Sequence, residues 1–357
     1  MHGVRAACFA GLTMTLCAAA QAETAVVRVV ATRSIANAAE LMALRQGYFA
    51  QHGLRVVWET SPNATEALAR VGQGKFQVAA TEISADYFNV LEKEASLIVV
   101  GDRASSPISH VLMLRRDLRS QVKSPRDLKG KVLAIDARGS LASYIIGKML
   151  EKEGLTIADV ELVPLAVTHM TDAFIGKAID AALLVPPYVY QFEEQKIAVP
   201  FASADVLVEP QPMTAAAIIV NTEWARTHPL VAQNYIHAWL RGVRDYCQGY
   251  HGAEVRNQIV EELLRMGTER PEILHKYPWP ARNADGRVNL ASLMDIQAWF
   301  VGNGLVKTAL PAERLADMSL VEAALQKLGP FELINSASRL PGCRSTSPLR
   351  STGQQDG

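Results

Sequence analysis

The chain alternates between β-branched apolar segments and amphipathic segments that start with helix-capping residues, and this alternation constrains its fold most. One helical segment opens with Asn37, three residues before Glu40, which is the spacing of a capping box. Strand–helix–strand repeats with short loops pair their strands in parallel and place helices on the sheet faces. The sequence therefore predicts an α/β fold, whose first strands lie at residues 26–31, 54–59, 77–80 and 97–101.

The same alternation restarts after residue 107 and gives a second α/β unit. Its predicted strands lie at residues 110–114, 131–136, 160–164, 180–185 and 215–221. From Thr222 onward the pattern is mostly helical, and we expect these helices to return to the first unit, which has few of its own. A length of 357 residues suits two domains. We therefore expect two lobes, each a mainly parallel sheet flanked by helices, with lobe I at residues 23–104 plus 222–335 and lobe II at residues 105–221.

Residues 1–22 have the pattern of a secretory signal peptide. Arg5 precedes a mostly apolar stretch, and Ala20-Gln21-Ala22 fits the small-x-small cleavage rule. The stretch falls short of the roughly 20 apolar residues that cross a bilayer, which favours cleavage over a membrane anchor. We therefore expect the mature protein outside the cytoplasm.

Cys247 and Cys343 are the two cysteines that would remain after cleavage. An oxidising compartment would allow them to pair. Cys343 lies in the tail at residues 336–357, which is rich in Ser, Thr, Gly, Pro and Arg and is predicted to be disordered. Spacing alone does not establish disulfide geometry, so the sequence leaves the pairing open.

The charge balance and the missing motifs exclude several classes of function. Lys plus Arg total 36 and Asp plus Glu total 36, so no basic field exists to attract nucleic acid. The chain has no Gly-x-Ser-x-Gly, His-Glu-x-x-His, Cys-x-x-Cys or Walker motif, and its eight His residues lack metal-ligand spacing. We therefore expect a monomeric protein that binds a small molecule, uses no metal or cofactor and is not an enzyme.

The loops after the predicted strands hold the candidate ligand-binding residues. In open α/β sheets a ligand binds outside the carboxyl ends of the strands, where helix N-termini present unpaired amides. Two such edges facing each other would form a binding cleft. The candidates in lobe I are Arg33, Ser34, Asn37, Asn63, Thr81, Glu82 and Ser84, and those in lobe II are Arg138, Gly139, Ser140, His169, Pro187 and Tyr188.

Several candidates also have a structural interpretation. Helix capping is the alternative role for Asn37, Asn63, Ser84 and Ser140. A cap satisfies a backbone amide and leaves the side chain less free for a ligand. His169 is alternatively a loop residue without a partner, and Tyr188 alternatively covers the rim of the cleft.

The charged candidates indicate different ligands. Arg138 precedes Gly139 and Ser140 at a strand-to-helix junction, where glycine permits close backbone approach and a guanidinium would suit an anion. Arg138 is alternatively a solvated surface residue. Glu82 would repel an anion but would accept hydrogen bonds from an amine or amide.

Four segments of the chain resemble one known family. They are Gly47-Tyr48-Phe49 with Gly53-Leu54, residues 124–132, residues 176–182, and residues 216–222 leading into His228-Pro229. Together they are similar to substrate-binding proteins of ABC importers, in the nitrate/sulfonate/taurine and thiamine-precursor branch, over residues 26–330.

The resemblance implies a periplasmic clamp of the type II binding-protein fold. Such a clamp would close on a small anion, namely nitrate, a sulfonate or a carboxylate, and deliver it to an ABC permease in the membrane. A thiamine-pyrimidine precursor is an alternative ligand, and a receptor kinase is an alternative partner. An enzyme of the same fold is a further alternative, although the cysteine-dense motif of the pyrimidine-forming type is absent here.

Overall fold

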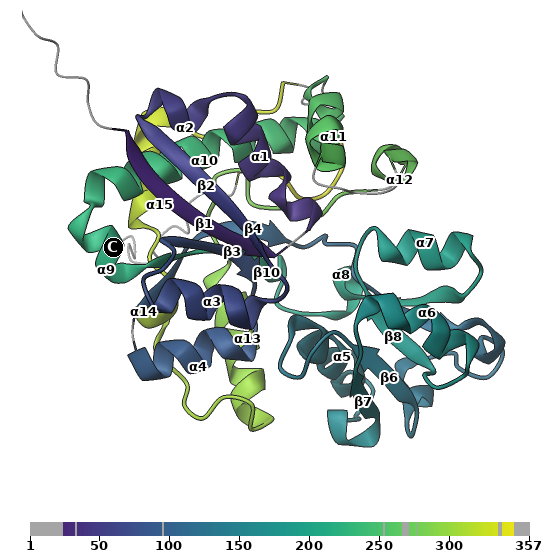
Figure 1. Ribbon diagram of the computed structural model, residues 1–357. Coiled ribbons are helices and arrows are strands. Elements are labelled where there is room, and N and C mark those ends of the chain that lie inside the picture. The colour runs from purple at the N-terminus through teal and green to yellow at the C-terminus, as the bar shows by residue number, and fades with distance from the viewer. Residues whose placement is uncertain are drawn as a thin grey trace, which may run out of the picture.

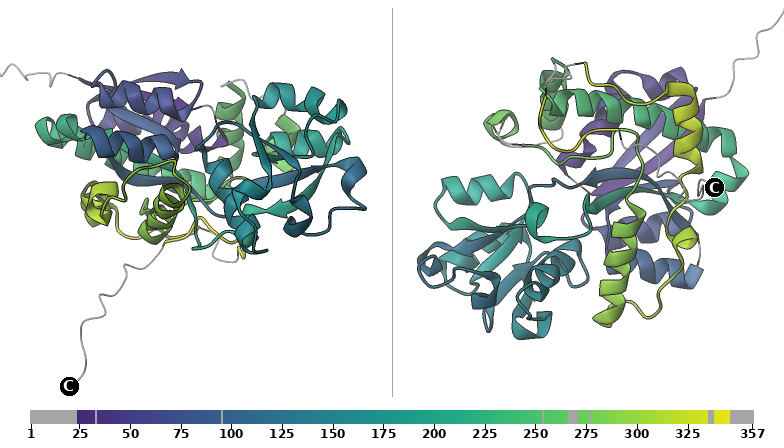
Figure 2. Two further views of the ribbon diagram at one scale, coloured as in Figure 1. Left: turned by 90° about the horizontal axis from the view of Figure 1, so that it is seen from below. Right: turned by 180° about the vertical axis from the view of Figure 1, so that it is seen from behind.

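Two five-stranded sheets, each flanked by helices, form two lobes in the computed structural model of the protein (Figures 1 and 2). The structure describes residues 24–32, 34–94, 96–252, 254–265, 271–276, 278–334 and 338–345. The expected signal peptide at residues 1–22 lies outside the described residues. The two-lobed α/β prediction is confirmed.

The two sheets have the same topology. The first has the order β2-β1-β3-β10-β4, with β1 (Ala25–Thr32), β2 (Leu54–Ser61), β3 (Val78–Glu82), β4 (Leu97–Ser105) and β10 (Thr214–Asn221). The second has the order β7-β6-β8-β5-β9, with β5 (Val111–Arg115), β6 (Val132–Ile135), β7 (Glu161–Pro164), β8 (Ala181–Leu184) and β9 (Ala198–Ser203). One strand in each sheet, β10 or β5, runs antiparallel to both of its neighbours. The other four share a direction, as expected of a mainly parallel sheet.

Strand β10 corrects the sequence interpretation. The sequence placed residues 215–221 at the end of lobe II, whereas β10 pairs with β3 and β4 in the first sheet. The reason is that strand pairing joins residues far apart in the chain, and short loops alone do not determine it. The boundary expected after residue 221 therefore lies before Thr214, and the chain crosses between lobes at residues 106–110 and again at residues 208–213.

The helices cover both lobes. Those beside the second sheet are α5 (Leu141–Glu151), α6 (Val167–Ile175), α7 (Tyr188–Glu194), α8 (Ala204–Leu207) and the 3-10 turns η2 (Arg116–Leu118), η3 (Pro125–Leu128) and η4 (Ile157–Asp159). The N-terminal helices of the first lobe are η1 (Ile35–Asn37), α1 (Ala38–Arg45), α2 (Tyr48–Gln51), α3 (Ala64–Gly72) and α4 (Ala85–Glu94). The later helices are α9 (Thr222–Thr227), α10 (Pro229–Tyr250), α11 (Val255–Arg265), α12 (Pro271–Lys276), α13 (Leu290–Gly302), α14 (Ala312–Leu315) and α15 (Ser319–Leu328). Within the described residues, no helix combines the length and apolar character that a membrane span requires.

The long helix α10 packs against the sheet of lobe I. Its buried Tyr235 and Trp239 share one apolar core with Val27 and Val29 of β1. Pro229 begins the helix, where its missing N–H costs no hydrogen bond. Helix α10 therefore packs on the sheet that contains β1, although the two are about two hundred residues apart in the chain.

Helix α13 also contacts lobe II. The Tyr144 hydroxyl on α5 donates to Asp295 Oδ2 over 2.7 Å, and Trp299 Nε1 donates to Glu151 Oε1 over 2.7 Å. Residues of α13 and α5 belong to a single apolar cluster that spans both lobes. This seam joins the lobes in addition to the two chain crossings.

The tail contains a disulfide bond and is ordered in its described part. Cys247 on α10 is bonded to Cys343, which is fully buried. The Tyr250 hydroxyl donates to the Pro341 carbonyl over 2.7 Å. The predicted disorder is therefore wrong for residues 338–345, because the cross-link and these contacts fix a segment whose composition resembles a loose tail. Residues 335–337 and 346–357 lie outside the described residues.

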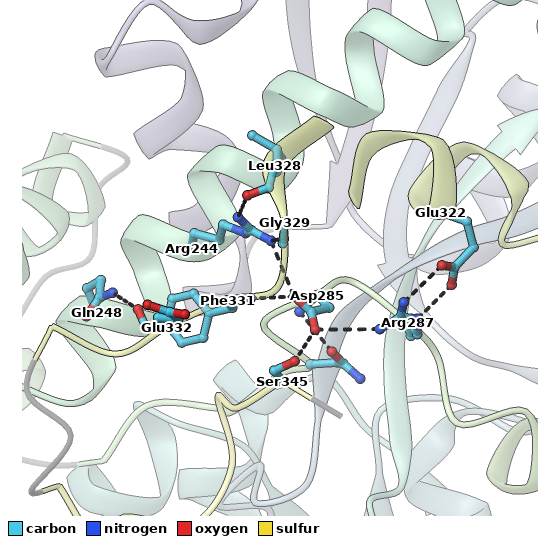
Figure 3. A network of polar contacts seen from close by, with 11 residues as sticks. Arg244, Gln248, Asp285, Arg287, Glu322, Leu328, Gly329, Phe331, Glu332 and Ser345 are labelled. Carbon is cyan, nitrogen blue, oxygen red and sulfur yellow. Dashed lines mark hydrogen bonds and ion pairs between the residues drawn. The ribbon is translucent and has the colours of Figure 1, made fainter. Parts of the chain in front are cut away.

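Asp285 anchors further C-terminal residues to α10 (Figure 3). Its Oδ1 accepts hydrogen bonds from the Phe331 amide at 3.0 Å and from Arg244 Nη2 at 3.4 Å. Its Oδ2 accepts from the Ser345 hydroxyl and forms an ion pair with Arg287 over 3.5 Å. Several donors offset the desolvation of the buried Asp285 carboxylate. The network therefore fixes Phe331 and Ser345 against α10, on what we call the back of lobe I.

Candidate ligand-binding cleft

A cavity of about 560 Å³ lies between the lobes. Residues at the carboxyl ends of β1, β3 and β8, and in the loop after β6, contribute to its walls. The first residues of α3, α4, α5, α6 and α7 complete them. This is the edge where the strand order predicted a binding site, and the volume is within the roughly 300–1,000 Å³ of small-molecule pockets.

Eight sequence-predicted residues line this cavity, and both lobes contribute. They are Asn63, Thr81, Glu82, Ser84, Arg138, Gly139, Ser140 and Tyr188. The structure thus brings together loops that are spread along the chain from Asn63 to Tyr188. Their contact with a ligand stays a prediction.

The other predicted residues do not belong to the described lining. Ser34 accepts a hydrogen bond from the Ala36 amide over 3.1 Å and caps η1, and His169 is exposed on α6. Pro187 precedes α7 beside the lining residue Tyr188. Arg33 lies outside the described residues.

Asn37 is buried inside lobe I. Its Oδ1 accepts a hydrogen bond from Arg103 Nη2, and Arg103 Nε donates to Glu40 Oε1 over 3.3 Å. All three side chains are almost completely buried. A buried guanidinium requires such partners, because desolvation otherwise makes its charge costly. Asn37 therefore serves the interior of the lobe.

Three hydroxyl groups of the lining have no hydrogen-bond partner within the described part of the chain. They belong to Thr81, Ser84 and Ser140, which are at most 7% exposed. Ser140 precedes α5 without making a side-chain cap bond, whereas Asn63 Oδ1 caps α3 by accepting from the Glu66 amide over 2.9 Å. The capping interpretation is thus confirmed for Asn63 and wrong for Ser140. The hydroxyls of the two walls remain available to a ligand.

The lobes touch beside the cavity at Gly139. The Ala85 amide at the start of α4 donates to the Gly139 carbonyl over 2.8 Å. Gly139 has φ +73°, and a Cβ there would lie 3.0 Å from the Ala85 Cβ. Both the backbone conformation and the close approach favour glycine, as the sequence suggested for this loop.

Glu82 is the most electrostatically perturbed carboxyl group of the lining. Burial, followed by the negative charge of Asp136, raises the pKa of Glu82 to about 7, and the nearby Arg103 opposes the shift. Glu82 belongs to lobe I and Asp136 to lobe II. The two walls therefore place carboxyl groups in electrostatic contact across the cleft.

The sequence did not identify several lining residues. Asp136 lies two residues before the predicted Arg138, and Asp86 lies in the first turn of α4, where the Thr65 hydroxyl donates to it. His110 was predicted as the first residue of a strand, and its burial lowers its pKa to about 3, which keeps the imidazole neutral. Extending each predicted loop by two residues would have found both Asp136 and Asp86.

One side of the cavity is apolar. Val167, Met170, Leu183 and Leu184 contribute to it from lobe II. Nowhere in the described ranges do three or more His, Cys, Asp or Glu side chains gather in a group that could hold a metal ion. The cleft thus combines a hydroxyl- and carboxyl-bearing part with an apolar part, a composition typical of sites for small organic molecules.

Comparison with solved structures supports the fold. The periplasmic nitrate-binding protein of Synechocystis PCC 6803 superposes with a TM-score of 0.69 and 11% identity, covering 90% of this chain and 92% of that one. The periplasmic aliphatic sulphonate binding protein of Escherichia coli gives a TM-score of 0.67 and 17% identity, covering 82% and 92%. The alkanesulfonate-binding protein of Xanthomonas axonopodis pv. citri, bound to MOPS, gives 0.62 and 18%, covering 85% and 98%.

Sequence comparison identifies the family. No curated protein matches the chain by sequence. The family model described as NMT1/THI5 like matches residues 35–249, which is more than half of the 357 residues. The chain therefore belongs to the NMT1/THI5-like family, and it has the two-lobed α/β fold of periplasmic binding proteins.

Proposed function

We propose that the protein is the solute-binding component of an ABC importer and that it captures a small molecule in the cavity between its lobes. One observation carries the proposal: the buried hydroxyls of Thr81, Ser84 and Ser140, which have no hydrogen-bond partner among the described residues, belong to both walls of one cavity. A buried polar group without a partner costs about 1–3 kcal/mol. A ligand that hydrogen-bonds to these groups would offset that cost.

Domain closure is the mechanism that this geometry supports. The cavity has one wall from each lobe, and the Ala85–Gly139 hydrogen bond already joins its edges. A ligand that contacts both walls favours the closed state by the difference between its affinities for the closed and open states. Closed protein would then dock on its partner.

A periplasmic location and a membrane permease as partner belong to the same proposal. The signal-peptide pattern of residues 1–22 and the periplasmic binding proteins of the same fold support both. Those relatives also support a binding role over an enzymatic one, because their names describe binding proteins.

A thermal-shift screen of the mature protein, followed by calorimetry, tests the binding function. A solute that binds only the folded state raises the melting temperature according to its concentration and dissociation constant. Ala142→Trp should abolish binding, because Ala142 lines the cavity and an indole would fill it. Ala158→Trp is the matched control, since Ala158 is exposed on η4. Equal affinity in the two variants would contradict the proposal.

A further inference from the structure

The charges that line the cavity are mostly negative. Glu82, Asp86 and Asp136 contribute carboxyl groups, and Arg138 is the one Lys or Arg in the described part of the lining. Arg138 and Asp136 are exposed, whereas Glu82 is half-buried. His110 adds no positive charge, because its burial keeps it neutral. The charged side chains of the lining would therefore repel an anionic solute more than they attract it.

The Glu82 carboxyl group has no hydrogen-bonded or ion-paired partner in the described part of the chain. The nearby Arg103 lowers the pKa of Glu82, but its guanidinium is bonded to Glu40 and Asn37 and not to Glu82. A carboxylate that is desolvated without a donor is costly, so a donor brought by a ligand would be favourable.

Glu82 and Asp136 disfavour each other's negative charge across the cleft. Asp136 of lobe II acts electrostatically on Glu82 of lobe I. When the lobes close, two carboxylates approach each other, which disfavours the closed state. A cation bound between the two carboxylates attracts both of them and so favours the closed state, whereas an anion increases the repulsion. A positively charged group would thus couple binding to closure.

The rest of the wall is suited to a hydrocarbon body. Met170, Leu183, Leu184 and Leu141 contribute apolar surface, and the Tyr188 ring is half-buried beside them. The Thr81, Ser84 and Ser140 hydroxyls can accept hydrogen bonds from an N–H head group. A volume of about 560 Å³ accommodates an organic molecule larger than a four-atom inorganic ion.

From these observations we infer that the cavity takes a small organic cation, with an amidinium or ammonium head held by Glu82 and Asp136 and an apolar or aromatic body against the lobe II wall. This inference rests on the proposed solute-binding function and names the ligand class of the same site. It replaces the anion expected from the family resemblance with a ligand of opposite charge.

Calorimetry with four ring compounds of similar size tests the charge preference. The probes are benzamidine as the cation, benzamide as the neutral isostere, and benzoate and benzenesulfonate as anions. We expect benzamidine to bind the wild-type protein at least tenfold more tightly than benzamide, and both anions to bind more weakly than benzamide.

Two substitutions locate the interaction. Glu82→Gln keeps the shape and removes the charge, so it should weaken benzamidine binding at least tenfold and change benzamide binding by less than threefold. Glu161→Gln is the matched control, because Glu161 is exposed on β7. It should leave both affinities unchanged.

The outcomes separate this inference from the proposed function. Tighter binding of benzoate or benzenesulfonate than of benzamidine, abolished by Ala142→Trp, would overturn the cationic ligand and support the binding function. No benzamidine binding at millimolar concentration, or an unchanged benzamidine affinity in Glu82→Gln, would also overturn it. Probe binding that Ala142→Trp leaves intact would place the probes elsewhere and contradict both proposals.

Discussion

Two loops at the same edge of the first sheet are used in opposite ways. Residues 34–37 follow β1 and residues 83–84 follow β3, and these strands are direct neighbours. Asn37 of the first loop binds the buried Arg103, whereas Ser84 of the second lines the cavity with a hydroxyl that has no partner in the described chain. Being in a loop at the end of a strand is thus not sufficient to line the cavity. A side chain also has to be free of internal partners.

The interior and back of lobe I differ from its cleft side in the same way. The interior and the back of the lobe contain the Arg103–Glu40 pair, the Cys247–Cys343 disulfide and the Asp285 network, all with internal partners. The cleft side contains Glu82 and the unpartnered hydroxyls. Substitutions in the interior or at the back should therefore change stability, and substitutions at the cleft should change affinity.

The largest effect on stability should follow from removing the disulfide. The cross-link joins residues 96 positions apart, and a loop of about 100 residues corresponds to about 4–5 kcal/mol in the chain-entropy model. The double variant Cys247→Ser, Cys343→Ser should lose about that much in chemical denaturation. Ligand affinity at a temperature where the variant is folded should stay within twofold, and a larger change would connect the tail to the cleft.

Arg103→Met should have the next largest effect. It leaves the Glu40 carboxylate buried without its cation, and breaking a buried pair in this way costs about 3–5 kcal/mol. Urea unfolding should detect the loss. Adding Glu40→Gln should recover part of it, because the second substitution removes the unpaired charge. A double variant no more stable than the single one would show that the pair is not the cause.

Glu82→Gln should change stability in a pH-dependent way. The pKa of Glu82 is raised from 4.5 to about 7, so the folded protein retains a proton that the unfolded chain has released. The stability due to this proton is complete below pH 4.5 and is lost as the pH rises through about 7. The variant should therefore match the wild type near pH 4 and exceed it at pH 8 by up to about 3 kcal/mol. Thermal unfolding at the two pH values checks this, and a constant difference would contradict the raised pKa.

The smallest effects on stability should come from Asn63, which caps α3, and from Ser140, whose hydroxyl has no partner among the described residues. Asn63→Ala removes the cap of α3 and should lower the unfolding free energy by about 1 kcal/mol. Ser140→Ala removes a buried hydroxyl without a described partner and should leave stability unchanged or slightly raised. Its effect should be a several-fold weaker ligand affinity, measured by calorimetry. A destabilised Ser140→Ala protein with unchanged affinity would reverse the assignment.

The sequence predicted the lobe II loop well because its signals are local. A strand runs into a helix through Arg138, Gly139 and Ser140; the glycine was expected to allow close approach of a ligand, and in the structure Ala85 makes the close approach. The same reasoning failed for Asn37, because its partner Arg103 lies on β4, far along the chain. Local patterns place strand ends and turns, and they do not show which distant side chain fills the interior.

Long-range pairing also explains the errors in the fold. The pattern of residues 215–221 predicted a strand, and only the assembled sheet shows that β10 inserts between β3 and β4. Likewise, the composition of the tail predicted disorder, and only the position of Cys247 beside Cys343 reveals the cross-link. Both depend on contacts between residues that the sequence separates widely.

Hydrogen–deuterium exchange on the mature protein, with and without a bound solute, tests the central claim most directly. We expect slower exchange on both walls of the cavity, at residues 81–86 and 136–142, when the solute bridges the lobes. Residues 35–40, whose side chains serve the interior of lobe I, should exchange at the same rate in both samples. Protection of one wall alone, or protection centred on residues 35–40, would contradict a ligand held between Glu82 and Asp136.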